Sequence, residues 1–261
     1  AAEIIEELAP RAFRRALTDD DRSALLGFYA LGEEEGGFEV GVRTAIEAML
    51  ASPDFVFRME EAPSGVRLGE NYRISDPDLA TRMSYFIWGL PPDAELRSLA
   101  TEGRLSNEGE LERQVTRMLA DPRSEALATR FAAQWLRLDD LDKVHPDRLL
   151  YPDFHQRLAD ELRRETELFF SNLVHQDGSV LDLFTADYSF MNERVARHYG
   201  IDGVIGEDFR RVDYVDENRR GLLGHASILT LTSVAGRTSP VLRGKYVMEV
   251  IMGTPPPPPP P

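Results

Sequence analysis

The chain has 261 residues, of which 42% are hydrophobic, so it is long enough for one large or two ordinary domains with a substantial core. Its 45 acidic and 30 basic side chains give a formal charge of −15 at pH 7, which repels phosphate backbones and argues against a nucleic-acid-binding protein. The absence of cysteine excludes disulfides, thiolate metal sites, a cysteine nucleophile and covalent attachment of a c-type haem within these residues.

Apolar residues recur mostly at helical spacing, which predicts an all-α fold: a bundle of about ten helices with at most a minor hairpin. An N-terminal three-helix unit is expected over residues 1–62. Its helices are predicted at 3–16, at 19–34 after the capping residue Thr18, and at 38–51.

Residues 62–71 are rich in glycine and polar side chains, which indicates a domain boundary there. A small hairpin is predicted from strands at 66–68 and 72–74. A central helical domain then covers residues 70–200. Its helices are predicted at 75–88, 92–102, 106–120, 122–138, 152–175, 180–184 and 191–199, with Ser75 and Ser106 as capping residues.

The third predicted part, residues 210–261, contains a helical pair and a connector. Residues 209–215 alternate in polarity and predict a lone strand, and the helices are expected at 218–231 and 240–252. The chain closes on seven prolines, which lack backbone donors and favour a polyproline II tail that serves as a spacer or docking strand. No apolar run approaches the roughly 18 to 20 residues that cross a bilayer, so no membrane span is predicted.

A carboxylate lies within an apolar helical stripe of the predicted 152–175 helix. At 100° per residue, Glu165 shares a face with Leu158 and Leu162, so we expect it to be buried. An arginine partner, for which Arg82 and Arg237 are the candidates, makes Glu165 an inert internal ion pair. Without a partner, burial raises the pKa of the carboxyl and suits it to general acid catalysis.

Gln134 also falls between apolar positions of its predicted helix, where an amide ordinarily satisfies neighbouring backbone groups. The sequence therefore predicts a buried polar network made of Glu165, Arg82, Gln134 and Arg237.

The five histidines do not occur in a paired metal-binding spacing, so no metal site is predicted. His198 and His225 are the candidates for haem contact, against a structural or surface role. Arg237, Thr238 and Ser239 precede a helix that begins with proline, and they form a candidate anion cradle or an ordinary helix cap. No serine-hydrolase signature, dinucleotide fingerprint or phosphate loop is present, so no catalytic residue is assigned.

Several long strings also resemble a known group of sequences. They include RRALTDDDRSALL, AIEAMLASPDFVFRME, LATRMSYFIWGLPPDAELRSLA, RMLADPRSEALATRFAAQWLRL, DYSFMNERVARHYGI, RRGLLGHASILTLTS and RTSPVLRGKYVMEVIMGTPPPPPP. Together they resemble adjoining bacterial domains of unknown function, the types numbered 1592, 1595 and 1588. These domains occur in large exported proteins that also carry c-type cytochrome domains. The resemblance implies three segments in the order given above, a periplasmic or envelope location, and c-type haem in flanking domains rather than in this chain.

These observations favour a non-enzymatic helical scaffold that positions flanking haem domains, with adjoining domains or a cytochrome subunit as partners. One alternative is an enzyme: a peroxidase-like unit with a neighbouring haem against His198, His225 or Glu165, or a hydrolase with Glu165 as its acid. A second alternative is a module whose acidic surface binds a basic partner or divalent cations. Whether the chain is an enzyme is left open by the sequence.

Overall fold

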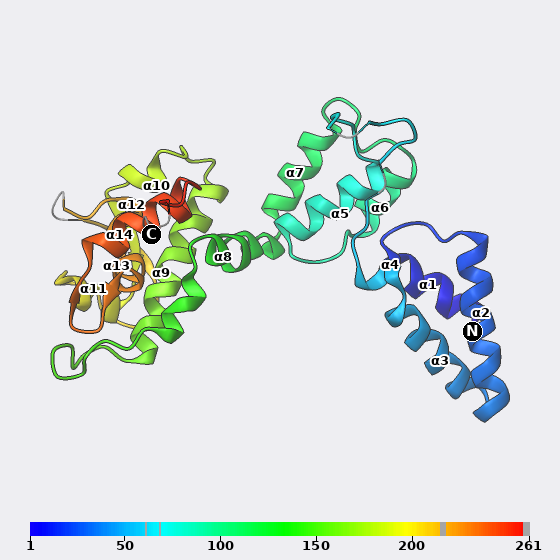
Figure 1. Cartoon of the computed structure of the whole chain (residues 1–261), viewed down its shortest axis with the longest axis horizontal. Coiled ribbons are helices and arrows are strands. Elements are labelled where there is room, and N and C mark those ends of the chain that lie inside the picture. Colours follow the sequence, from blue (N-terminus) through cyan, green and yellow to red (C-terminus); the bar gives the residue numbers. More distant parts are fainter. Residues whose placement is uncertain (61, 68, 215–217, 258–261) are drawn as a thin grey trace. The chain divides into compact units, whose positions relative to one another are not determined.

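The computed structural model describes residues 1–60, 62–67, 69–214 and 218–257 (Figure 1). It is predominantly helical, with two short two-stranded antiparallel sheets among the described residues, and this confirms the predicted all-α class. The chain forms two compact units, Ala1–Arg123 and Ser124–Pro261. None of the described helices is long and apolar enough to cross a membrane.

The first unit begins with a helical hairpin packed on a preceding helix. The elements are α1 (Ala2–Phe13), α2 (Asp19–Gly36), α3 (Phe38–Ala51) and α4 (Pro53–Val56). Thr18 caps α2 through a reciprocal pair of hydrogen bonds with Asp21, as its sequence position predicts. The helices α2 and α3 approach closely at Gly41, where an added Cβ would lie 2.8 Å from the carbonyl oxygen of Tyr29.

The remainder of the first unit consists of α5 (Asp76–Ile87), α6 (Ala94–Thr101) and α7 (Glu110–Ala120). Ser75 caps α5 as predicted. The predicted cap at Ser106 is wrong: α7 begins after Gly109, and the Ser106 hydroxyl donates to Asp76 instead. The described residues of the predicted hairpin, 66–67 and 72–74, form no strand, and position 68 lies outside the described residues.

The predicted helix over 122–138 is helical but not regular. It consists of a 3₁₀ turn η1 (Pro122–Glu125), a π-helical turn η2 (Leu127–Ala132) and α8 (Ala133–Trp135), followed by η3 (Leu138–Lys143). A π-helical turn holds more residues than an α-helical turn, so it rotates every later side chain relative to a straight helix. Trp135 fixes this segment in the second unit by donating its indole N–H to the Val250 carbonyl at 2.9 Å.

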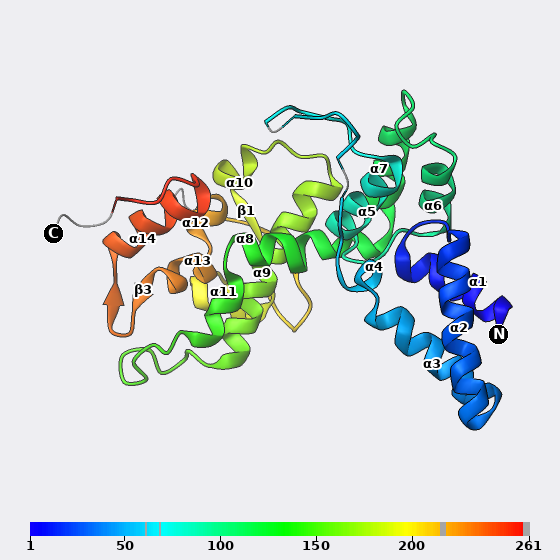
Figure 2. The same cartoon turned by 45° about the vertical axis from the view of Figure 1, so that its right-hand side comes forward.

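The long helix α9 (Gln156–His175) is the central element of the second unit. It contacts β1 (Tyr188–Met191), α11 (Glu193–Tyr199) and α13 (Ala226–Leu231), as Figures 1 and 2 show. The segment predicted as a lone strand forms β2 (Arg210–Asp213), but it pairs with β1 in the register Tyr188↔Asp213. The predicted helix from Met191 therefore begins two residues later, after the capping residue Asn192.

The remaining elements of the second unit are short. They are α10 (Asp182–Thr185), α12 (Gly221–Gly224), β3 (Ser233–Val234), β4 (Arg237–Thr238), α14 (Pro240–Tyr246) and η4 (Val247–Ile251). The predicted helix over 218–231 is broken because His225 has an extended backbone. Gly221 has φ +54°, and its added Cβ would lie 2.4 Å from the Leu183 carbonyl oxygen. Residues 255–257 have no regular structure, and the rest of the predicted polyproline tail lies outside the described residues.

Candidate functional site

Glu165 lies at the centre of the second unit and is fully buried, as the helical pattern predicts. Its Oε1 accepts a hydrogen bond of 2.7 Å from the Ser189 hydroxyl on β1. Its Oε2 accepts another of 2.7 Å from the Tyr199 hydroxyl on α11. Among the described residues, no arginine binds the carboxylate directly, so the expected internal ion pair is not formed.

Burial is the dominant influence on this carboxyl group and raises the pKa of Glu165 to about 7. The two hydroxyl donors and the nearby positive charge of Arg219 act in the opposite direction. Tyr199 also accepts a hydrogen bond of 2.7 Å from the Ala226 backbone N–H, so one phenol joins α9 to α11 and α13. The pKa of Tyr199 is raised well above its usual value, first by burial and then by Glu165, so it stays a donor.

A second set of polar groups adjoins this carboxyl group. The His225 ring is fully buried, with Nδ1 3.0 Å from the Thr166 hydroxyl and Nε2 3.4 Å from the Ser189 hydroxyl. Thr166 is in turn 2.7 Å from the Ser227 hydroxyl. Burial lowers the pKa of His225 to about 3, so the imidazole is neutral at physiological pH. We call Glu165, Thr166, Ser189, Tyr199, His225 and Ser227 the buried polar network.

The buried polar network differs from a catalytic triad in two respects. A triad carboxylate orients the histidine, whereas Glu165 binds the serine itself. In addition, Ser189 and His225 are fully enclosed, so neither faces a cavity in which a substrate can bind. The arrangement cross-links α9, β1 and the C-terminal elements rather than presenting a nucleophile.

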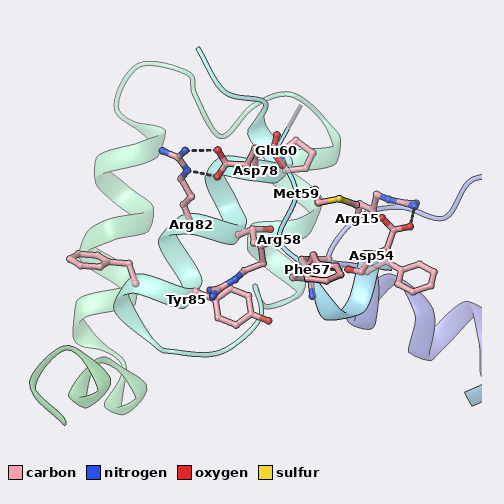
Figure 3. Close-up of a pocket in the computed structure, with 14 residues that line it drawn as sticks. Arg15, Asp54, Phe57, Arg58, Met59, Glu60, Asp78, Arg82 and Tyr85 are labelled. Carbon is pink, nitrogen blue, oxygen red and sulfur yellow. Dashed lines mark hydrogen bonds and ion pairs between the residues drawn. The ribbon is translucent and has the colours of Figure 1, made fainter. Parts of the chain in front are cut away.

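Arg82 lies in the first unit, where it lines a cavity of about 690 Å³ (Figure 3). Its Nε donates to Oε1 of Glu60, and its Nη2 donates to Oε2 of the same carboxylate. The predicted partnership between Arg82 and Glu165 is therefore wrong, because each side chain is already satisfied within its own unit. Figure 3 also shows Arg15 paired with Asp54, at 2.9 Å.

Gln134 is exposed, so its predicted place in a buried network is also wrong. The reason is the π-helical turn η2, which rotates α8 relative to the straight helix that the sequence pattern assumes. Of the four residues expected to form one buried network, only Glu165 is buried and hydrogen-bonded to another buried polar side chain. Ser189, Tyr199 and Ser227 were missed because single hydroxyl residues on separate elements have no common spacing.

A second cavity, of about 470 Å³, lies at the surface of the second unit. We call it the arginine pocket because Arg219, Arg237 and Arg243 line it. His198 lines it as well. Desolvation by the surrounding protein lowers the pKa of His198, with the charge of Arg219 as the second cause, which favours a neutral imidazole.

The predicted anion cradle is split between this pocket and a helix cap. Arg237 and Thr238, on β4, both line the arginine pocket. Ser239 instead caps α14, with its hydroxyl 3.4 Å from the Leu242 N–H. Of the two histidines predicted for haem contact, His198 lies at a cavity, whereas His225 is enclosed. Within the described part of the chain, no group of three or more potential metal ligands comes together.

The fold and these sites define a predominantly helical protein of two compact units, with an enclosed polar centre and an arginine-lined cavity in the second. Three family models match the chain. They are PSD5, "Protein of unknown function (DUF1595)", at residues 1–60; PSD4, "Protein of unknown function (DUF1592)", at 74–201; and PSCyt3, "Protein of unknown function (DUF1588)", at 219–261. These matches confirm the resemblance seen in the sequence. No match was found among curated proteins or solved structures.

The matched segments do not coincide with the compact units. The 74–201 segment contributes α5 to α7 to the first unit and α8 to α11 to the second, because the boundary between the units falls at Arg123 and Ser124. The division into domains at 1–62, 70–200 and 210–261 therefore stays a prediction.

Proposed function

We propose that the chain is a non-catalytic helical scaffold within a larger exported bacterial protein, where it positions flanking c-type cytochrome domains. The observation that carries this proposal is the complete internal use of Glu165. Both of its oxygens accept hydrogen bonds from hydroxyls of the same unit, and the side chain is fully buried. A reactive carboxyl needs access to a substrate, whereas this one holds the secondary structure together.

The energetics of the buried polar network suit a rigid spacer. Hydrogen bonds in a low-dielectric interior are strong, and a mispaired buried polar group costs about 1–3 kcal/mol, so alternative packings of the same helices are disfavoured. The bonds from Tyr199 to Glu165 and from Ala226 to Tyr199 connect segments on both sides of β2 in the sequence. The second unit is thereby held in one arrangement.

The partners and the location in this proposal come from the resemblance to cytochrome-associated domains. The partners are adjoining domains of the same polypeptide or a cytochrome subunit, in the periplasm or cell envelope. Because the chain contains no cysteine, thioether-linked haem belongs to those neighbours.

The proposal is tested in the longer protein by spectroscopy and electron transfer. We expect c-type haem bands in its reduced-minus-oxidised spectrum. Replacing the 261 residues by a glycine-serine linker should leave the haem content unchanged and slow electron exchange between the flanking haems. A longer protein without haem bands, or one whose electron exchange is unaffected by the linker, would contradict the scaffold role.

A redox unit is the second candidate, and His198 is the observation that favours it. Its pKa is lowered, so the neutral imidazole is available at the rim of the arginine pocket, whereas Glu165 and His225 are enclosed. Titrating the chain with haemin distinguishes the candidates. A Soret shift that is lost in His198→Ala and kept in His145→Ala would favour the redox unit. No shift in the unmodified chain favours the scaffold.

A further inference from the structure

The arginine pocket concentrates positive charge on a strongly acidic protein. Among the described residues, none of Arg219, Arg237 and Arg243 forms an ion pair, although acidic side chains outnumber basic ones by 45 to 30. One carboxylate, Asp153, lines the same cavity and is exposed. Three guanidinium groups against one carboxylate leave the pocket with a net positive charge.

The larger cavity of the first unit provides an internal comparison. It is also lined by arginines, but Arg15 pairs with Asp54 and Arg82 pairs with Glu60. Arg14 donates to backbone carbonyls that include that of Phe57, at 2.8 Å. Those guanidinium groups are occupied in holding the first unit together, whereas none of the three in the second unit forms an ion pair with a carboxylate in the described part of the chain.

Neutral contacts hold two of these arginines in place. Arg243 donates to the Thr238 hydroxyl at 3.0 Å and to the Thr232 hydroxyl at 3.4 Å. Arg219 donates to the Gly224 carbonyl at 3.3 Å, and its guanidinium lies 4.6 Å from the centre of the Tyr199 ring. These contacts orient the side chains without neutralising their charge, which is the arrangement that a preorganised anion site requires.

Much of the rest of the lining is apolar. It comes from α13 and from two segments that are joined by a backbone hydrogen bond. The Asp147 N–H donates to the Ala235 carbonyl at 2.8 Å, which holds the loop after η3 against the β3–β4 turn. The apolar lining residues are Val144, Pro146, Leu150, Pro152, Phe154, Ala226, Leu229 and Val234. A cavity of about 470 Å³ lies within the range of small-molecule sites, roughly 300–1,000 Å³.

We propose that the arginine pocket binds an organic anion, namely a carboxylate or phosphate group attached to an apolar body. Arg237 and Arg243 bind the anionic group, and the apolar residues of the 144–154 loop and β3 contact the body. Neutral His198 adds a hydrogen-bonding group without further charge. This inference is independent of the scaffold role, because it concerns the surface of the second unit rather than its closed interior.

The test is isothermal titration calorimetry on the 261-residue chain with octanoate, octyl phosphate, inorganic phosphate and octylamine. We expect one or both octyl anions to bind, inorganic phosphate to bind more weakly, and octylamine not to bind. The comparison of octanoate with octyl phosphate identifies the preferred anionic group. Arg237→Gln should weaken binding about tenfold or more, the usual scale for loss of a charged hydrogen bond. Arg148→Gln is the matched control, since Arg148 is exposed and does not line the pocket.

A second variant, Val234→Glu, places a carboxylate at the pocket and should abolish binding of the octyl anions. Its partly exposed position, 43% accessible, makes the change tolerable for folding. The proposal is overturned if neither octyl anion binds at millimolar concentration or if Arg148→Gln weakens binding as much as Arg237→Gln. It is also overturned if Val234→Glu has no effect, or if inorganic phosphate binds as tightly as the octyl anions.

Discussion

Replacing Glu165 by glutamine should remove a pH-dependent contribution to the stability of the second unit. The amide has nearly the shape of the carboxyl group, and its oxygen can accept from Tyr199 while its NH₂ donates to Ser189. At acidic pH, where Glu165 is protonated, the variant and the unmodified chain should therefore have similar stability. They should differ as the pH rises, because only the carboxyl group can ionise.

The sign and size of the effect follow from the pKa of Glu165, about 7 in the folded chain against an ordinary value of 4.5. The folded state binds this proton more tightly than the unfolded state. The contribution of this proton to the free energy of unfolding is fully present below about pH 4.5. It is lost as the pH rises through about 7. The difference between the two pKa values corresponds to about 3 kcal/mol.

The assay is urea unfolding of Glu165→Gln and the unmodified chain between pH 4.5 and 8.5. His225 contributes in the opposite direction: its pKa is lowered to about 3, so its neutral burial costs stability as the pH falls below 6.5. The informative quantity is therefore the difference between the two proteins at each pH. We expect the free energy of unfolding of the variant to rise relative to that of the unmodified chain by about 3 kcal/mol between acidic and alkaline pH. Parallel pH profiles would refute the burial of an ionisable, proton-binding Glu165, and Glu207→Gln, at an exposed site, is the control.

Three further substitutions test the structural interpretation. Tyr199→Phe leaves a buried carboxylate oxygen and a backbone N–H unpaired and should cost about 1–3 kcal/mol in urea unfolding; an unchanged midpoint would contradict the bridging role of its hydroxyl. Gly221→Ala combines a left-handed backbone with a clash against Leu183 and should cost about 2–4 kcal/mol, whereas Gly244→Ala, which has open space around it, should be neutral or stabilising. Thr18→Ala should lower the free energy of unfolding of the first unit by about 1 kcal/mol and Thr18→Ser should not; equal losses in calorimetry would show that the cap is not the cause.

Helices that are defined by local signals were predictable from the sequence. The third helix was predicted over 38–51 and has those bounds, and Thr18 and Ser75 cap the helices they were expected to cap. The π-helical turn η2 was not predictable, because nothing in a straight-helix pattern marks where an extra residue enters a turn. The strand β1 was missed because it is four residues long and its pairing partner, β2, lies far away in the sequence.

The candidate sites divide in the same way. The burial of Glu165 follows from helical periodicity on a single element, but its partners come from β1 and α11 and are set by tertiary packing. Likewise, the local motif before α14 indicated Arg237 and Thr238, whereas Arg219 reaches the same cavity only through the fold. The pattern on one helix therefore predicts which polar residue is buried. It does not predict which residues of other elements form its hydrogen bonds.

The second compact unit, Ser124–Pro261, contains residues of two matched segments, and this has a consequence for how the protein can be divided and recombined. A fragment trimmed to the DUF1592 match, residues 74–201, would keep Glu165 and Tyr199 but lose Ala226, whose amide completes the bridge. It would also expose the apolar side of α9, where Leu158 and Leu162 pack against Ala226. Recombination between the segments matched at 74–201 and 219–261 would then separate residues that fold together, so these two segments should be inherited as one piece.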